Sequence, residues 1–188
     1  MRRWVIVLIL IVSSPWVQAT NTAPDYCPKT IGLLKNSCNR LHQIWYEGKN
    51  ELYVPAYAWH NRYYYSSDKI GLYNENPWGA GLGKSYYDEN RNWHGIYAFA
   101  FLDSHKNIEP FVGYAFAKMF HFDEKAAIGP GLAFALTSRP DILHSVPFPG
   151  VLPLLSVNYQ RASVTFVYIP GSHNVGNVLF FLVRWVLN

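Results

Sequence analysis

From Glu51 onward, the character of the side chains alternates from one residue to the next, and this period of two constrains the fold more than any other feature. Such a period predicts strands whose two faces differ in character. Most of the alternating segments are near the length of about 9–11 residues with which a tilted strand crosses a bilayer. They comprise residues 52–65, 77–87, 92–103, 108–120, 127–138, 149–158, 162–170 and 177–187. The chain is therefore predicted to be all-β.

The connections between these segments alternate in length and composition. Residues 88–91, 121–126 and 159–161 form short links, whereas residues 66–76 and 139–148 form longer polar or proline-containing ones. Residues 104–107 lie on the same side as the longer links. Short turns on one side and longer loops on the other are typical of outer-membrane barrels. We expect an eight-stranded antiparallel up-and-down transmembrane β-barrel over residues 48–188, with both termini on the periplasmic side.

Four consecutive segments, from residue 77 to residue 138, carry small residues on one face and bulky apolar residues on the other. The small faces comprise Gly79, Gly81, Gly83, Ser85, Ala98, Ala100, Gly113, Ala115, Ala117, Gly131, Ala133 and Ala135. We expect the bulky faces to meet lipid and the small faces to line the lumen. Because a barrel of this size is normally filled by its own side chains, small residues would leave a narrow apolar cavity suited to an acyl chain. The alternative is that they permit strand curvature and tight packing.

The N-terminus is typical of a secretory signal. Arg2 and Arg3 precede an apolar run over residues 4–12, and Val17-Gln18-Ala19 resembles a cleavage pattern. We expect residues 1–19 to be a cleaved signal peptide, so that the mature protein starts near Thr20. Outside the signal, 14 basic residues exceed the 12 acidic ones by two. That balance does not indicate a nucleic-acid partner.

Residues 20–47 are predicted to form a periplasmic segment that contains a helix from residue 29 to residue 46. Its apolar stripe consists of Ile31, Leu34, Cys38, Leu41 and Trp45. The helix could lie in a membrane interface or pack on a soluble core. Cys27 and Cys38 are the only cysteines, and in an oxidising compartment they could pair. The alternative is two independent residues, with Cys38 buried as a small hydrophobe.

Few residues indicate chemistry. The seven histidines show no metal-ligand spacing, and no phosphate-binding loop or nucleophile elbow is present. His60 shares the parity of Ala56 and Ala58, which predicts that it faces the lumen or its rim. Asp103 and Ser104 end the third segment at the same rim, so the three side chains could perform acyl transfer with His60 as general base. The alternative is an ordinary polar rim with an Asp-Ser turn.

Two prolines fall where strands are predicted. Pro55 and Pro170 cannot donate to a β-ladder, and a closed barrel has no edge where such residues are normally found. Each proline would therefore open a local gap, and a gap facing lipid could admit a lipid substrate from the side. The alternative is that both prolines mark strand ends or bulges.

Five ordered motifs resemble the PagP family of lipid A palmitoyltransferases from Gram-negative outer membranes. They are Tyr53-Val-Pro-Ala-Tyr-Ala-Trp-His60, Tyr73-Asn-Glu-Asn-Pro-Trp-Gly79, Asn92-Trp-His-Gly-Ile-Tyr-Ala-Phe-Ala-Phe-Leu-Asp-Ser104, Glu109-Pro-Phe-Val-Gly-Tyr114 and Tyr168-Ile-Pro-Gly171. The resemblance implies a barrel with an amphipathic periplasmic helix. It also implies transfer of an acyl chain, usually palmitoyl, from a glycerophospholipid donor to lipid A, with no cofactor or metal.

The same resemblance places the family's catalytic residues on His60, Asp103 and Ser104, and its lateral lipid gates on Pro55 and Pro170. Ala115 stands where the family has a glycine at the floor of the acyl-chain site. One additional methyl there predicts a preference for a chain slightly shorter than palmitate, or for one of a different shape. His105 follows Ser104 where the family often has an aromatic residue, and the chain ends without a terminal aromatic residue. We expect a monomer.

Two alternatives to the acyltransferase stay open. An outer-membrane lipid hydrolase would pass the acyl group to water. A non-catalytic structural or lipid-binding barrel would have a filled lumen and would give His60, Asp103 and Ser104 no reason to converge. A small pore is disfavoured by the predicted apolar lining.

Overall fold

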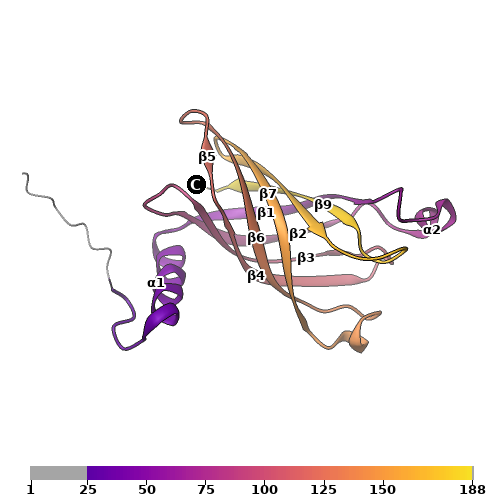
Figure 1. The fold of residues 1–188 in the computed structure, drawn as a ribbon, viewed down its shortest axis with the longest axis horizontal. Coiled ribbons are helices and arrows are strands. Elements are labelled where there is room, and N and C mark those ends of the chain that lie inside the picture. Colours follow the sequence, from indigo (N-terminus) through magenta and orange to yellow (C-terminus); the bar gives the residue numbers. More distant parts are fainter. Residues whose placement is uncertain (1–24, 188) are drawn as a thin grey trace, which may run out of the picture.

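The computed structural model describes residues 25–187, which form a closed antiparallel barrel with helical segments at both ends (Figure 1). The predicted signal peptide, residues 1–19, lies outside the described residues. The barrel segments are β1 (Lys49–His60), β2 (Gly79–Tyr87), β3 (Trp93–Leu102), β4 (Ile108–Ala117), β5 (Phe120–His121), β6 (Ala126–Thr137), β7 (Phe148–Tyr159), β8 (Ala162–Ile169) and β9 (Val178–Val186).

Consecutive segments pair with each other except β4 and β5, and the β1–β9 and β4–β6 ladders complete the ring. The segments β4 and β5 form one strand interrupted at Lys118 and Met119, because both pair with β6. The barrel therefore has eight strands, as the alternation predicted. The prediction that the first strand extends to residue 65 is wrong, since β1 ends at His60 and a turn follows.

The two ends of the barrel differ as the connection lengths predicted. The helix α1 (Gly32–Glu47) and the C-terminus lie at one end, together with the short turns (Figure 1). The six-residue helix α2 (Ser67–Leu72) and the short helix η1 (Leu143–Ser145) lie in the longer connections at the other end. We call these the α1 end and the α2 end.

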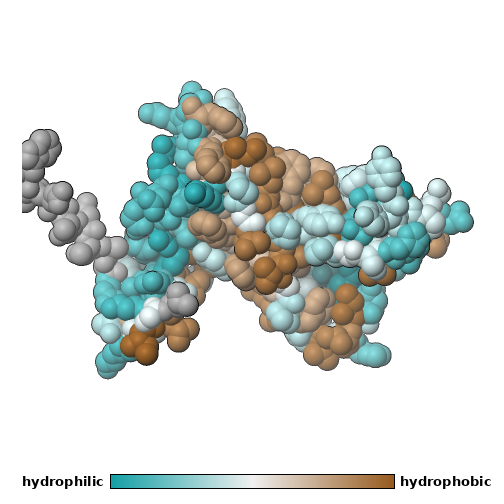
Figure 2. Space-filling model, viewed as in Figure 1, coloured by the Kyte–Doolittle hydropathy of each residue, from teal (hydrophilic) through white to brown (hydrophobic). Residues whose placement is uncertain are grey.

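Large apolar side chains form a belt around the outside of the strands. Figure 2 shows this belt as a brown band between two more polar ends. Its exposed members include Val54, Leu82, Val112, Leu132, Phe134, Leu136, Val151, Leu155, Val157 and Val164. An outward apolar band of this kind is what the hydrocarbon core of a bilayer requires of a spanning barrel.

The prediction that all four small faces line the lumen is wrong for β3. Tyr97 and Phe99 of β3 are buried inside the barrel, while Ala98 is exposed on its outer face. The neighbouring β2 leaves room for these rings, because a Cβ added at Gly81 would overlap Cβ of Phe99. The glycines of β2 thus make room for aromatic rings. This agrees with the alternative that the small residues permit tight packing.

The helix α1 packs on the barrel through Gln43 and Ile44, which are 5% and 0% exposed. Its predicted apolar stripe faces away from the barrel instead, with Ile31 and Leu34 more than two thirds exposed. An exposed apolar stripe beside the belt favours a membrane interface over packing on a soluble core. No helix among residues 25–187 is long and apolar enough to cross a membrane.

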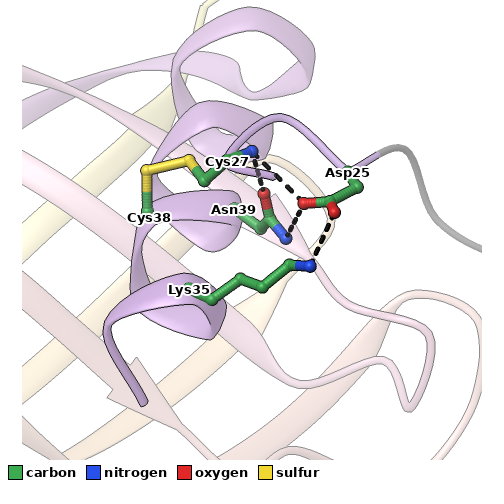
Figure 3. The surroundings of a disulfide bond; sticks show 5 residues. All are labelled: Asp25, Cys27, Lys35, Cys38 and Asn39. Carbon is green, nitrogen blue, oxygen red and sulfur yellow. Dashed lines mark hydrogen bonds and ion pairs between the residues drawn. A yellow bond between two sulfur atoms is a disulfide. The ribbon is translucent and has the colours of Figure 1, made fainter. Parts of the chain in front are cut away.

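A disulfide joins Cys27 to Cys38, which confirms the paired alternative (Figure 3). The side chain of Asn39 accepts a hydrogen bond from the Cys27 backbone N–H at 3.0 Å, and Asp25 forms an ion pair with Lys35 at 2.7 Å. These contacts hold the segment before α1 against one side of the helix.

A buried ion pair closes the lumen at the α1 end. Arg184, 1% exposed, lies 3.1 Å from the Glu51 carboxylate and donates to Ser156 and Thr165 at 2.8 and 3.0 Å. The Trp93 ring covers its guanidinium at 3.9 Å. We call this group the plug.

Candidate active site

His60 is the last residue of β1 and lies at the α2 end, where it is 1% exposed. A bulge between Pro55 and Tyr57 shifts the alternation of β1. Ala58 and His60 are consequently buried, but Ala56 is exposed, so the expected shared face of Ala56 and His60 is wrong. The bulge follows Pro55, which has no N–H to give to the ladder.

Both ring nitrogens of His60 have partners. Its Nε2 lies 3.0 Å from the Ser104 hydroxyl, and its Nδ1 lies 3.1 Å from the Glu75 carboxylate. The Tyr65 and Tyr73 rings pack against the imidazole at centroid distances of 5.2 and 4.9 Å. The structure thus brings His60 and Ser104 together at the rim where the first and third strands were both expected to end.

Glu75 was not among the predicted site residues. It belongs to the motif over residues 73–79, between α2 and β2, but this connection has no periodicity that would predict a contact with His60. In the structure its carboxylate accepts hydrogen bonds from the Arg62 guanidinium, the Tyr57 hydroxyl at 2.7 Å and the His60 backbone N–H at 3.1 Å. The bonds from Arg62 hold the pKa of the Glu75 carboxyl well below its usual range, so Glu75 is ionised.

An ionised carboxylate can only accept hydrogen bonds. The proton between Glu75 and His60 must therefore belong to Nδ1, and in the neutral imidazole Nε2 is then an acceptor. The Ser104 hydroxyl then donates to Nε2. Geometry of this kind allows the imidazole to take a proton from a hydroxyl group at the mouth of the barrel.

Asp103 is buried, at 3% exposed, but its carboxylate does not contact His60. One oxygen accepts hydrogen bonds from the backbone N–H groups of His105 and Asn107, both at 2.8 Å. The other oxygen lies 3.6 Å from the Arg139 guanidinium. Asp103 therefore organises the turn that presents Ser104.

The loop that carries Glu75 is tied to the same turn. The Asn74 backbone N–H donates to the Ser104 carbonyl at 2.8 Å, and the Asn74 side chain reaches the Asp103 carbonyl at 3.3 Å. His60, Glu75 and Ser104 are thus fixed relative to one another by backbone as well as side-chain contacts.

The two predicted gate prolines lie beside interruptions of the barrel wall. The β1–β2 ladder ends where Tyr53 pairs with Gly81, so residues 54–60 of β1 have no ladder partner in β2. The β7–β8 ladder begins at Leu154, opposite Val167, and Pro170 directly follows β8. Both interruptions lie in the half of the barrel nearer the α2 end. Pro153, the residue before Leu154, marks the second interruption and was not predicted.

Ala115 lies inside the barrel, 3% exposed, opposite Gly95 and Ala133 on the adjacent strands. Aromatic rings cross the lumen between this level and the α2 end. Phe99 and Phe111 have centroids 5.4 Å apart, and Phe101 and Phe180 have centroids 5.0 Å apart. This part of the lumen is thus apolar as expected, with aromatic rings beside the small residues of β4 and β6. At the α1 end the lumen is polar, because Arg184 and Glu51 of the plug are buried there.

Two groups among the described residues have the composition of metal ligands. Cys27, Cys38 and His42 form one, and its two sulfur atoms are joined in the disulfide. Asp103, His105 and Asp141 form the other. There the Arg139 guanidinium lies 2.8 Å from Asp141 and 3.6 Å from Asp103 and already supplies positive charge.

A closed antiparallel barrel with an outward apolar belt defines a membrane-type β-barrel, and this one carries a contact between His60 and Ser104 at one mouth. The family described as "Antimicrobial peptide resistance and lipid A acylation protein PagP" matches residues 40–184. The chain belongs to this PagP family.

Several relatives bear the name lipid A acyltransferase PagP. The Legionella pneumophila protein is 48% identical over 182 residues, which cover 97% of each chain. The protein of Bordetella pertussis strain CS is 51% identical over 169 residues, 90% of this chain and 91% of the relative. The protein of Legionella longbeachae serogroup 1 is 49% identical over 159 residues, 84% of this chain and 69% of the relative.

Proposed function

We propose that this protein is an outer-membrane acyltransferase that moves an acyl chain from a glycerophospholipid to lipid A. Family membership supports the acceptor, since the relatives are named lipid A acyltransferases. The observation that carries the proposal for this chain is the 3.0 Å contact between His60 Nε2 and the Ser104 hydroxyl at one mouth of an apolar lumen. The protein acts as a monomer after export through a cleaved signal peptide, residues 1–19.

The chemistry joins the acyl carbonyl carbon of the donor to a hydroxyl oxygen of the acceptor and breaks the donor's ester bond. His60 Nε2 takes the proton of the attacking hydroxyl group and returns it to the alkoxide of the departing lysophospholipid. Ser104 orients the reacting groups through its hydroxyl, and Asp103 holds the turn that places Ser104. No cofactor takes part in these steps.

The donor reaches the lumen through the interruptions beside Pro55 and Pro170. Both interruptions lie on the same half of the barrel as His60, so a chain entering there would have its ester group near the mouth. The chain then lies along the small faces of β4 and β6, opposite the aromatic rings of β3, with its methyl end towards Ala115. The donor chain is palmitoyl or slightly shorter.

An acyl-transfer assay tests the proposal. Protein folded in detergent is given phospholipid with a labelled acyl chain and lipid A, alongside His60→Ala and Ser104→Ala variants whose folding is checked by circular dichroism. We expect label on lipid A with the wild type and its loss in both variants. Label released only as free fatty acid would identify the hydrolase instead, and no turnover would favour a non-catalytic barrel.

A further inference from the structure

We infer that Glu75 is a positioning residue that orients His60 and fixes its proton, so that the acidic partner of the His60–Ser104 pair is Glu75 and not Asp103. This inference rests on the proposed function for its catalytic consequence. Its structural part, which nitrogen of His60 carries the proton, follows from the contacts and the charge of Glu75 and does not depend on the proposed function.

The two carboxylates near His60 have different partners. Glu75 lies 3.1 Å from Nδ1, on the opposite side of the ring from Ser104. Asp103 instead accepts from two backbone N–H groups and faces Arg139. A base that must take a proton at Nε2 needs an acceptor at Nδ1, and only Glu75 fills that position.

Glu75 is itself held in place. Arg62 contacts both carboxylate oxygens, Tyr57 donates to one of them, and the His60 backbone N–H donates to the other. The other side chains against the imidazole are the rings of Tyr65 and Tyr73, together with Ser104. Glu75 is therefore the one acidic group in direct contact with His60 among the described residues.

Its effect differs between the two states of the imidazole. With neutral His60, Glu75 keeps the proton on Nδ1 and directs Nε2 towards the hydroxyl group. When Nε2 takes a proton during transfer, the ring becomes positive and the adjacent carboxylate stabilises it. The proton then leaves from Nε2 to the departing alkoxide, and Glu75 stays ionised throughout.

The test compares the isosteric variant Glu75→Gln with Glu75→Asp and with a matched control, Glu124→Gln, which makes the same change at an exposed turn residue. We expect Glu75→Gln to lower kcat by about 10- to 100-fold, a part of the factor of about 10²–10⁴ that a positioned base contributes. KM should change little. The acid limb of the pH–rate profile should move to lower pH, because the imidazolium loses its carboxylate. Glu75→Asp should recover part of kcat, and Glu124→Gln should match the wild type.

A second measurement does not require activity. Long-range ¹H–¹⁵N spectra identify which nitrogen of His60 is protonated, with its signals assigned by their loss in His60→Ala. We expect the proton on Nδ1 in the wild type and a shift towards Nε2 in Glu75→Ala. If the wild type transfers no acyl chain, the proposed function fails, and this measurement still decides the role of Glu75. Unchanged kcat and pH profile in Glu75→Gln, or the proton on Nε2 in the wild type, would overturn the inference.

Discussion

The two ends of the barrel both bury a charged or titratable side chain beside a glutamate, yet they leave different groups available. Arg184 and His60 are each 1% exposed. At the plug, the guanidinium is fully enclosed by Glu51, Ser156, Thr165 and the Trp93 ring. At the α2 end, the chain of contacts runs from Arg62 through Glu75 and His60 and stops at Ser104, which is only partly buried. Burial of a charged or titratable side chain therefore does not by itself distinguish the end at which we propose the chemistry from the other end.

The largest expected effect separates the two ends through their serines. Ser104→Ala should lower acyl transfer by about 10²–10⁴-fold, because it removes the hydroxyl group at His60 Nε2. Its free energy of unfolding should change by less than about 1 kcal/mol, since Glu75 still holds His60. Acyl-transfer rates and urea unfolding from lipid vesicles measure both quantities.

The matched control is Ser156→Ala in the plug. Ser156 donates to Asn158 at 2.6 Å and accepts from Arg184 at 2.8 Å, so its loss should lower stability and leave the transfer rate of the folded protein unchanged. Loss of activity in both variants, or in Ser156→Ala alone, would contradict the assignment of chemistry to one end.

The next effect is on stability. Arg184→Met leaves Glu51 buried without its cation, which should cost about 3–5 kcal/mol of unfolding free energy. The double variant Arg184→Met with Glu51→Gln should lose less, because no uncompensated charge remains. Urea unfolding of the single and double variants checks this order. Equal losses in the single and double variants would mean that the plug acts through packing and not through charge.

The sequence predicted the barrel well, because period-two alternation and connection length are properties of the chain itself. It could not orient β3, because both faces of this strand are apolar. The glycines of β2, which leave room for Phe99 inside the barrel, meet β3 only in the folded protein. It also missed the bulge after Pro55, which separates Ala56 from the face of His60. Glu75 could not be found, since only the fold brings an aperiodic loop residue to Nδ1 of His60.

A smaller effect concerns the lumen between the two ends. Ala115→Gly removes one methyl group where the small faces of β4 and β6 meet, so the preferred acyl chain should lengthen by about one methylene. Pockets discriminate a single methylene by about 10- to 200-fold, which sets the size of the expected change in relative rates. Donors that differ by one carbon, assayed in competition, measure it.

Ala80→Gly is the control, because Ala80 is exposed on the outer face of β2. The donor preference should stay unchanged in this variant. A sharp palmitate optimum in the wild type would refute the preference for a shorter chain that Ala115 predicts. An identical preference in Ala115→Gly would show that the chain does not reach this level.

The smallest effect is expected at the disulfide, which lies outside the barrel. Cys27→Ser with Cys38→Ser should leave the transfer rate and the unfolding of the strands unchanged, since neither cysteine contacts the plug or the mouth. Hydrogen exchange should become faster for residues 25–31, which the disulfide and the bond from Cys27 to Asn39 hold against α1. Faster exchange in β1 as well would show that residues 25–31 stabilise the barrel. The stability of the α1 end would then depend on this segment as well as on the plug.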